Sequence, residues 1–399
     1  DSSGGEIFLE SGTGNLTLTS GTLTAGTVTL TSNAGEVDIA SDPNNTAGGI
    51  TFGPSAGITL DASLTANGPI DASVVTGDIT IGTAATTIDS TNADITLGGT
   101  ILGTQDLILD AGAAGVISLQ AVGDGATDPT SVTVTDAAGL VLNGSIQSTG
   151  AVDLDAADST TLTADVTITG DAVGASAIEL GDVSGPHTLT LDADADNGGA
   201  ADDGNIALGG GNIGALAISD ANNVNFDSPF TAAGSIAVNT DISGVIAVNA
   251  VVNAGDALNL TAAGDVDINA AGSAAGATTL DSTAGTLDID ANVGGASISL
   301  NGATAIEFND GVSIHATNGG VTAVDAVTLD GALADGVTVS SDAGNVTFTA
   351  AVDAAAAGEQ SLAVNALGGT VDFQAAVGAT TNLGGITINA MASVFGKAV

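Results

Sequence analysis

The sequence predicts an all-β fold, a right-handed parallel β-solenoid in which about 20 residues form each coil of a single elongated rod. Three observations support this prediction. Apolar residues recur at a fixed period, apolar and polar positions alternate within each repeat, and glycine, asparagine or aspartate separates the strand-like phrases. The handedness follows the rule that crossover connections between parallel strands are right-handed. The predicted solenoid covers residues 1–399.

The clearest repeat lies between residues 244 and 350, where an apolar file recurs at a nearly constant interval and a second file follows two positions later. The first file is Ile246, Val266, Leu287, Ile306, Val327 and Val346, and the second is Val248, Ile268, Ile289, Phe308, Leu329 and Phe348. Side chains two positions apart lie on the same face of a strand. We therefore expect Leu287 and Ile289 to point inward, each packed between its counterparts in the neighbouring coils.

A polar file is expected at the end of these strands. One position after the second apolar file, five repeats carry an amide or a carboxylate and the sixth carries Thr349; the five are Asn249, Asn269, Asp290, Asn309 and Asp330. Stacked coils lie about 4.8 Å apart. The polar side chains are therefore expected to form an ordered ladder along one corner.

The N-terminal region repeats the same pattern. Leu16, Val37, Ile58 and Ile79 follow one another at a constant interval, and Val28 and Ile50 mark a further strand in each coil. We expect two or three short strands per coil, joined at glycine, asparagine or aspartate corners into a triangular or flattened outline. Regular coils are predicted for residues 7–94 and 244–349.

The intervening and final segments are less regular. Residues 95–243 keep the strand phrases with variable spacing, and two inserts stand out, Gly123 to Ser131 and Asp192 to Gly204. In residues 350–399 the spacing stretches across an alanine-rich segment, where a helical cap and a bulged end both remain open.

The charge of the chain excludes several classes of partner. One lysine, no arginine and 46 acidic residues give a formal net charge of −45. No basic patch exists to meet phosphates, so we expect neither nucleic acid nor an anionic membrane surface as a partner. No apolar run is long enough to predict a membrane span. Because the sequence opens at Asp1 without Met, we expect a processed or excised segment.

The phrases GNLTLTS at 14–20, GTVTLTS at 26–32 and GEVDIAS at 35–41, repeated in similar form through the chain, resemble the repeat region of filamentous haemagglutinin-like exoproteins. Those proteins are two-partner-secreted β-helical adhesins. The resemblance covers nearly the whole chain and implies a β-helical fold at the cell surface or in the extracellular space. The Asn-Pro-rich signature of that family's secretion domain is missing from this sequence.

Catalysis is not expected. Lys397 is the only basic side chain besides the histidines, and Trp and Tyr are absent, so the chain lacks the cationic groups of polysaccharide lyases and the aromatic platforms of sugar sites. His187 and His315 follow no metal-ligand spacing and no nucleophile–base pattern. We expect both histidines to be exposed or to lie at corners.

Two sets of carboxylates predict binding of Ca²⁺. Asp192, Asp194, Asp196 and Asp203 occupy positions 1, 3, 5 and 12 of an EF-hand-like loop, whose alternating oxygen ligands converge on one hard cation. Asn197 replaces the turn glycine and Asp203 the usual Glu, so a solvated acidic loop is the alternative.

The second set is an outward file between the two apolar files. Asp267, Asp288 and Glu307 occupy equivalent places in consecutive repeats. Stacked carboxylates repel one another unless a cation or a water molecule bridges them. Cation bridging and an unbridged ladder both remain open.

These observations predict a non-enzymatic extracellular structural protein, a surface fibre or sheath subunit or an adhesin stalk, stabilised by divalent cations. Its expected partners are copies of itself joined end to end as a filament, or flanking segments of a larger adhesin. The first alternative is an adhesin passenger module that binds a host or carbohydrate ligand through the inserted loops. The second is an acidic intracellular protein of a salt-loving organism.

Overall fold

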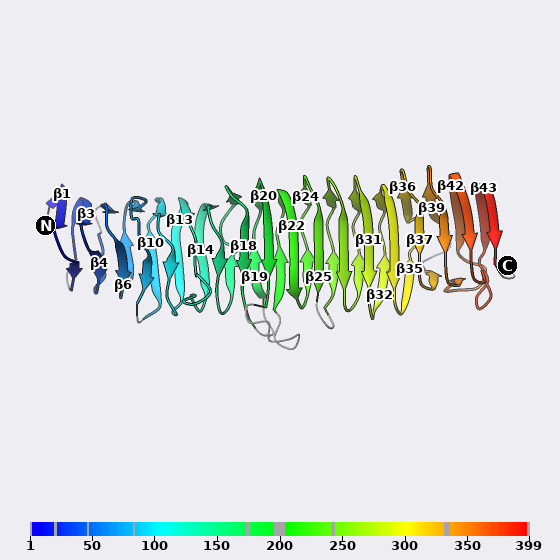
Figure 1. Cartoon of the computed structure of the whole chain (residues 1–399), viewed down its shortest axis with the longest axis horizontal. Coiled ribbons are helices and arrows are strands. Elements are labelled where there is room, and N and C mark those ends of the chain that lie inside the picture. The colour runs from blue at the N-terminus through cyan, green and yellow to red at the C-terminus, as the bar shows by residue number, and fades with distance from the viewer. Residues whose placement is uncertain are drawn as a thin grey trace. The chain divides into compact units, whose positions relative to one another are not determined.

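The computed structural model describes residues 2–19, 22–45, 48–82, 84–172, 176–194, 204–240, 244–330 and 336–396. These residues form strands, turns and bends, and none of them lies in a helix. The chain divides into two compact units, Asp1–Asn205 and Ile206–Val399. Strands of neighbouring coils lie side by side within each unit (Figure 1), and every strand pair of the described chain is parallel. The predicted fold class, an all-β parallel solenoid, is confirmed.

The first unit has three sheets. One contains β1 (Ser2–Ser11), β3 (Ala25–Ser32), β5 (Gly49–Phe52), β8 (Ile70–Ala72), β11 (Ile95–Leu97), β13 (Leu107–Leu119), β14 (Val132–Leu142), β17 (Thr160–Leu162) and β20 (Val183–Asp192). The second contains β2 (Leu16–Leu18), β4 (Glu36–Ile39), β6 (Gly57–Leu60), β9 (Ile79–Ile81), β12 (Ile101–Leu102), β15 (Ile146–Gln147), β18 (Val166–Thr169) and the end of β20. The third contains β7 (Leu64–Ala66), β10 (Thr86–Ser90), the first parts of β13 and β14, β16 (Val152–Leu154) and β19 (Ser176–Leu180).

The second unit repeats this arrangement. Its first sheet contains β21 (Asn205–Leu208), β23 (Val224–Phe226), β26 (Ile246–Val248), β29 (Val266–Ile268), β32 (Thr286–Ile289), β35 (Ala305–Phe308), β38 (Val327–Leu329) and β41 (Val352–Ala354). The second contains β22 (Gly211–Ala221), β24 (Phe230–Ala232), β27 (Val252–Ala254), β30 (Gly272–Ala274), β33 (Val293–Gly295), β36 (Ser313–Ala316), β39 (Val337–Ser341), β42 (Ser361–Phe373) and β43 (Gly385–Phe395). The third contains β25 (Ile236–Thr240), β28 (Leu258–Ala262), β31 (Ala277–Ser282), β34 (Ser297–Gly302), β37 (Val321–Ala323), β40 (Val346–Phe348) and the later parts of β22, β42 and β43.

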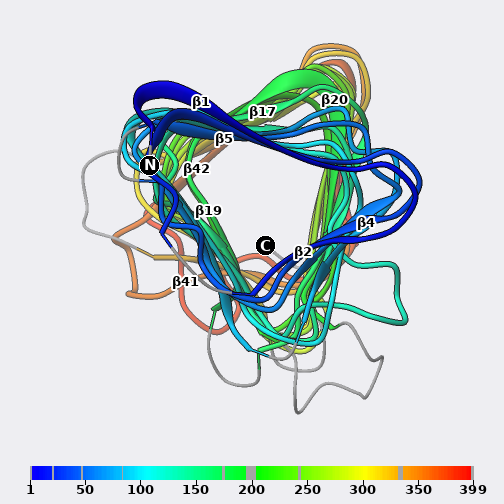
Figure 2. The ribbon, with the colours of Figure 1, turned by 90° about the vertical axis from the view of Figure 1, so that its left-hand side faces the viewer.

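From β5 onward, most coils therefore carry a strand segment in each of the three sheets, and the coils have a triangular outline (Figure 2). In the first unit, seen from the end that carries the N-terminus, the chain runs from β1 along the top to β2 at the lower right (Figure 2), as in a right-handed coil. The expected succession of Leu16, Val37, Ile58 and Ile79 is confirmed by the pairing of β2, β4, β6 and β9. Val28 and Ile50 pair in a different sheet, as expected. Coil length varies elsewhere, from a short step between β21 and β23 to a long one between β16 and β19.

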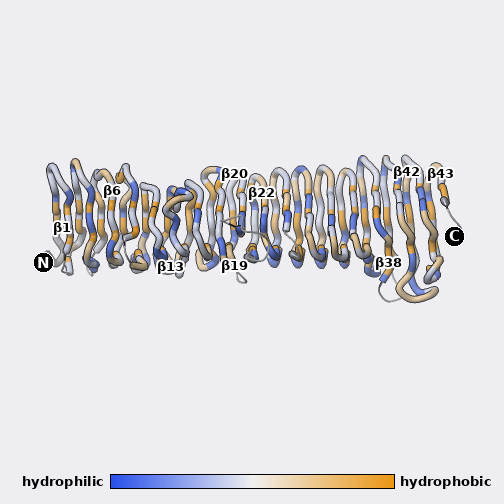
Figure 3. Tube along the Cα trace, turned by 60° about the horizontal axis from the view of Figure 1, so that its bottom comes forward, coloured by the Kyte–Doolittle hydropathy of each residue, from blue (hydrophilic) through white to orange (hydrophobic). Residues whose placement is uncertain are grey.

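The core of each unit consists of inward-facing aliphatic side chains and a few phenylalanines. Hydrophobic positions recur at matching places on successive coils (Figure 3). Leu287 and Ile289 are fully buried, and each pairs with its counterparts in the coils before and after, as predicted. Burying such a side chain stabilises the fold by about 1.5–3 kcal/mol. Phe373 stacks between Phe348 and Phe395, with ring centroids 4.9 and 5.3 Å apart.

Buried hydroxyl groups close several corners. Ser32, Ser282 and Ser341 are fully buried. Their Oγ atoms donate to the carbonyl oxygens of Gly14, Gly264 and Gly319, at 2.8, 2.6 and 2.6 Å. A buried hydroxyl without a partner would destabilise the fold, and the glycine carbonyl at each corner supplies that partner.

The prediction that Val346 and Phe348 end the two apolar files is wrong. Val327 of β38 pairs with Val352 of β41, and Val346 instead pairs with Val321 in the third sheet. The coil from Val327 to Val352 is longer than the coil before it, which runs from Ile306 to Val327. The constant period predicts that the strand one repeat after Val327 belongs to the first sheet. Because this coil is longer, the strand found there is β40 of the third sheet, and the first-sheet strand β41 follows it.

The final segment contains no helix among its described residues. The alanine-rich stretch forms β41 and a turn before β42. The stretched spacing expected in this segment is confirmed, because Val346 of β40 pairs with Val371 of β42.

A cysteine-pair experiment tests the corrected register. Thr328 pairs with Asp353 on the outward face, and neighbouring strands lie about 4.8 Å apart, within the Cα separation of a disulfide. We expect the double variant Thr328→Cys/Asp353→Cys to form an intramolecular disulfide under mild oxidation. The pair Thr328→Cys/Thr347→Cys should stay reduced. Mass spectrometry after thiol labelling distinguishes the two, and oxidation of the second pair alone would contradict the register.

Candidate functional site

A ladder of three carboxylates lies on the outward face of the first sheet in the second unit. Asp267 of β29 pairs with Asp288 of β32, which in turn pairs with Glu307 of β35. Ala247 and Thr328 occupy the equivalent positions on either side. The sequence therefore predicted the position of the ladder correctly.

The position of this ladder disfavours ionisation of its carboxylates. Burial and the neighbouring charges of Asp290, Glu307, Asp267 and Asp330 raise the pKa of Asp288 to about 6. Burial, followed by the charges of Asp265 and Asp290, raises the pKa of Asp267. The Oδ1 atom of Asp288 is buried and has no hydrogen-bond partner among the described residues. A bridging cation would offset both the repulsion and the unmet acceptor.

An amide ladder runs beside the carboxylates, at the ends of the same strands. Asn249 Nδ2 donates to Asp227 Oδ1 at 2.7 Å, and Asn269 Nδ2 donates to Asn249 Oδ1 at 2.9 Å. Asn309 Nδ2 donates to Asp290 Oδ1. The predicted polar file is thus confirmed, and it extends one coil further back, to Asp227.

Thr349 is not a member of the amide ladder. It follows β40 in the third sheet, where its Oγ1 donates to the carbonyl oxygen of Ala323 at 3.2 Å. This correction has the same cause as that of Val346, the lengthened coil between β38 and β41.

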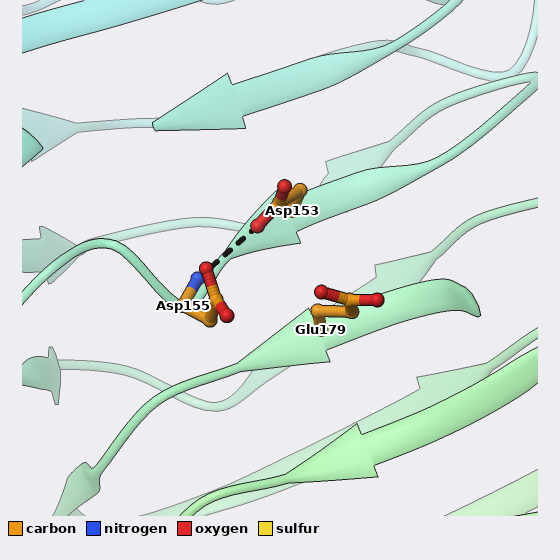
Figure 4. A group of neighbouring side chains, drawn as sticks. All are labelled: Asp153, Asp155 and Glu179. Carbon is orange, nitrogen blue, oxygen red and sulfur yellow. Dashed lines mark hydrogen bonds between the residues drawn. The ribbon is translucent and has the colours of Figure 1, made fainter. Parts of the chain in front are cut away.

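A second carboxylate group lies in the first unit, and the sequence analysis missed it. Carboxylate oxygens of Asp153, Asp155 and Glu179 all lie within 4.8 Å of one another (Figure 4), the one such group of three ligands within the described ranges. Asp153 and Glu179 face each other across β16 and β19. The sequence offers one signal for this group, the D-x-D of Asp153 and Asp155 at a strand end. Glu179 could not be assigned to the group, because its interval from Asp153 is well beyond the usual repeat.

The carboxylates of this group share one charge environment. Burial raises the pKa of Asp153 to about 6, helped by the side chain and the charge of Asp155 and by the charge of Glu179. The backbone N–H of Asp155 donates to Asp153 Oδ1 at 3.4 Å. Three oxygens at this separation match the ligand type of Ca²⁺, which takes carboxylate oxygens in flexible geometry.

Half of the predicted calcium loop lies within the described residues. Asp192 ends β20, and its Oδ1 accepts a hydrogen bond from the backbone N–H of Asp194 at 3.1 Å. Asp194 is 9% exposed. Asp196 and Asp203 lie outside the described residues.

The two inserts line one cleft in the first unit. Gly125 and Asp128 from the first insert, with Asp192 and Asp194 from the start of the second, border a cleft of about 250 Å³. Gln147, Ser148 and Thr169 complete its lining. Asp128 Oδ1 accepts hydrogen bonds from the backbone N–H groups of Asp124 and Gly125, which fixes the bend of the first insert.

Each histidine contacts an aspartate. His187 Nδ1 lies 3.6 Å from Asp165, and His315 Nε2 lies 3.4 Å from Asp342. His315 Nδ1 also lies 2.8 Å from Ser340 Oγ, a neighbour in the next coil that sequence spacing does not indicate. Ser340 Oγ also lies 3.2 Å from the carbonyl oxygen of Ile314, an acceptor for its hydroxyl proton. With that proton donated to Ile314, the His315 ring nitrogen would donate to Ser340 and would not act as a base toward it.

A comparison with protein-family models, with curated proteins and with solved structures finds no match to this chain. In the described part of the chain, no helix has the length and apolar character to cross a membrane.

The raised pKa values predict the pH dependence of stability. Asp153 and Asp288 have folded pKa values of about 6, against about 3.9 in an unfolded chain. Between these values the folded chain binds more protons than the unfolded chain, so stability falls as the pH rises from about 4 to about 6. We expect a melting temperature several degrees higher at about pH 5 than at about pH 7.5.

The variant Asp288→Asn should raise the melting temperature at neutral pH and flatten its pH dependence. Thermal denaturation followed by circular dichroism measures both effects. Glu36→Gln, at an exposed position of β4, removes the same charge outside either group. An equal effect of Glu36→Gln would assign the pH dependence to net charge and contradict a role for the ladder.

Proposed function

We propose that this chain is a non-enzymatic structural protein of the extracellular space or the cell surface, a fibre or sheath subunit or an adhesin stalk. The observation that best supports this proposal is that the coils of each unit pair continuously through three parallel sheets. Hydrogen bonds in these sheets run along the direction in which the coils stack. A pull along the stack is therefore shared among three sheets, which suits a load-bearing element.

Divalent cations, Ca²⁺ above all, are the proposed stabilising ligands. The chain carries a net charge of −45, and self-repulsion of that size opposes a compact state. Two carboxylate groups, one in each unit, hold side chains whose pKa is raised to about 6. Cations bound between such carboxylates relieve repulsion at the positions where it is greatest.

The proposed partners are copies of the chain joined end to end, or flanking segments of a larger adhesin. Among the described residues, β1 pairs with β3 alone and β43 with β42 alone. A strand with a free edge accepts a further strand. Two apolar side chains of β43, Met391 and Val394, are 77% and 51% exposed. The repeat phrases and the solenoid also support a relationship to filamentous haemagglutinin-like exoproteins.

The second candidate function is that of an adhesin passenger that binds a host or carbohydrate ligand through its inserts. One observation favours it: residues of both inserts, including Asp128 and Asp194, border the same cleft of about 250 Å³. Inserts that meet at one cleft are typical of recognition by a repeat protein.

Removal of calcium tests the role of the cations. Because a cation that binds only the folded chain stabilises it by mass action, we expect chelator to lower the melting temperature. Calcium should restore it further than sodium at equal ionic strength. The double variant Asp153→Asn/Asp288→Asn should lose most of this calcium effect, whereas Glu36→Gln should keep it. If chelator does not change the melting temperature, specific calcium sites are contradicted, and the cations around the chain form only a diffuse counterion atmosphere.

Sedimentation velocity over a wide concentration range tests the filament. Head-to-tail contacts do not close on themselves, so the mean mass should rise continuously with concentration. Ile388→Asp, at a half-buried position of β43, should abolish the rise because it places a charge against the apolar edge. The adjacent outward change Asn389→Asp adds the same charge and should leave association intact. A wild-type chain that remains monomeric throughout would favour a segment of a larger adhesin.

A further inference from the structure

A polar groove runs along one corner of the first unit, where the first and second sheets meet. The turns of four successive coils line it, residues 76–78, 98–100, 120–121 and 143–144, around a volume of about 290 Å³. These turns follow strands of the first sheet and lead into the second sheet. The groove therefore crosses the coils, perpendicular to the strands.

Several turn positions of this corner are glycines and carry no side chain. A Cβ atom at Gly77 would lie 1.5 Å from the carbonyl oxygen of Ala56, and one at Gly99 would lie 2.1 Å from that of Gly77. At Gly144 the corresponding distance to the Gln120 carbonyl oxygen is 2.4 Å. Each turn rests so closely on the turn before it that only glycine fits. The close packing explains the glycines, and it leaves the backbone half-buried at Gly77 and Gly144, whereas Gly99 is buried.

Hydrogen-bonding groups of the groove remain available. Within the described residues, the backbone N–H groups of the half-buried Gly77 and Gly144 donate no hydrogen bond, and neither the Thr100 hydroxyl nor the Gln120 amide makes one. Gln120 is exposed and Thr100 is half-buried. Backbone and side-chain amides and hydroxyls offer both donors and acceptors, so the matching ligand carries both kinds of group.

The groove is nearly uncharged. Asp78 is its one ionisable side chain, in a chain with 46 acidic residues. The carboxylate groups described above suit cations, whereas this lining suits a neutral ligand. No aromatic ring lines the groove, so hydrogen bonds provide the recognition.

The spacing of the coils selects the kind of polymer. Successive coils lie about 4.8 Å apart, whereas an extended peptide repeats every ~3.2–3.4 Å. A peptide laid across the coils would lose register within a few residues. One pyranose ring with its glycosidic oxygen is close in length to one coil step, and every ring presents hydroxyl groups that both donate and accept.

We propose that this corner groove binds a neutral, extended, β-linked polysaccharide with one sugar per coil. The glycine turns form its floor, and Thr100 and Gln120 supply side-chain hydrogen bonds. This role goes beyond the structural function proposed above and lies outside the two inserts. Because each sugar gains only hydrogen bonds, affinity rises with chain length until four coils are covered.

Isothermal titration calorimetry with cellohexaose, an extended neutral β-glucan, tests the proposal. The wild-type chain should bind it, and binding should persist at high sodium chloride because the ligand is uncharged. Maltohexaose has the same composition in a curved chain and should bind at least tenfold more weakly. The double variant Thr100→Val/Gln120→Ala should weaken cellohexaose binding about tenfold by removing two hydrogen bonds.

The matched control is Thr322→Val/Asn365→Ala, two outward positions of β37 and β42 in the second unit. It should bind cellohexaose as the wild type does, and circular dichroism should show all variants folded. Absent binding, equal binding of the two sugars, or equal loss in both double variants would overturn the proposal. None of these results bears on filament formation, so the two roles are tested separately.

Discussion

The structure depends on one constraint: a residue in a parallel solenoid lies directly against its counterpart one coil away. That register rewards like residues in the interior, where Leu287 meets Val266 and Ile306. It penalises like charges on the outside, where Asp288 meets Asp267 and Glu307. The same stacking that builds an aliphatic core therefore builds carboxylate ladders, and fold and charge cannot be adjusted independently.

The chain reduces this conflict with amides. At the ends of the strands that carry the ladder, Asn249, Asn269 and Asn309 lie among acidic residues, and each donates to the preceding member of the file. An amide can accept from one neighbour and donate to the other, so an amide file satisfies itself, whereas carboxylates only accept. Where no amide intervenes, the pKa rises, as at Asp153 and Asp288. The two carboxylate groups are thus positions at which stacking leaves a charge uncompensated, and Asp89, paired with Asp110, is another, with a pKa raised by burial and by the charge of Asp110.

The sequence predicted the fold class and the register where the coils have constant length, as in the file from Leu16 to Ile79. It failed where a coil grew, because each coil contains three similar apolar phrases and a longer coil places the wrong phrase at the expected distance from Val327. For the same reason Asp153 and Glu179 could not be paired from the repeat length alone. The corner groove was not predicted, since its glycines are visible in the sequence but the stacking of their turns along one corner is not.

The coil-to-coil pairing also determines how each unit gains and loses order. Every described strand pair joins residues that lie one coil apart in the sequence, so no coil depends on a distant part of the chain. Such an array behaves as a one-dimensional lattice in which each folded coil provides the strand edges on which the next coil pairs. Its weakest points are its ends, where a rung has one neighbour, and melting there proceeds as unzipping. Each coil added to the array increases its resistance to unfolding, and the cross-section of the core stays the same.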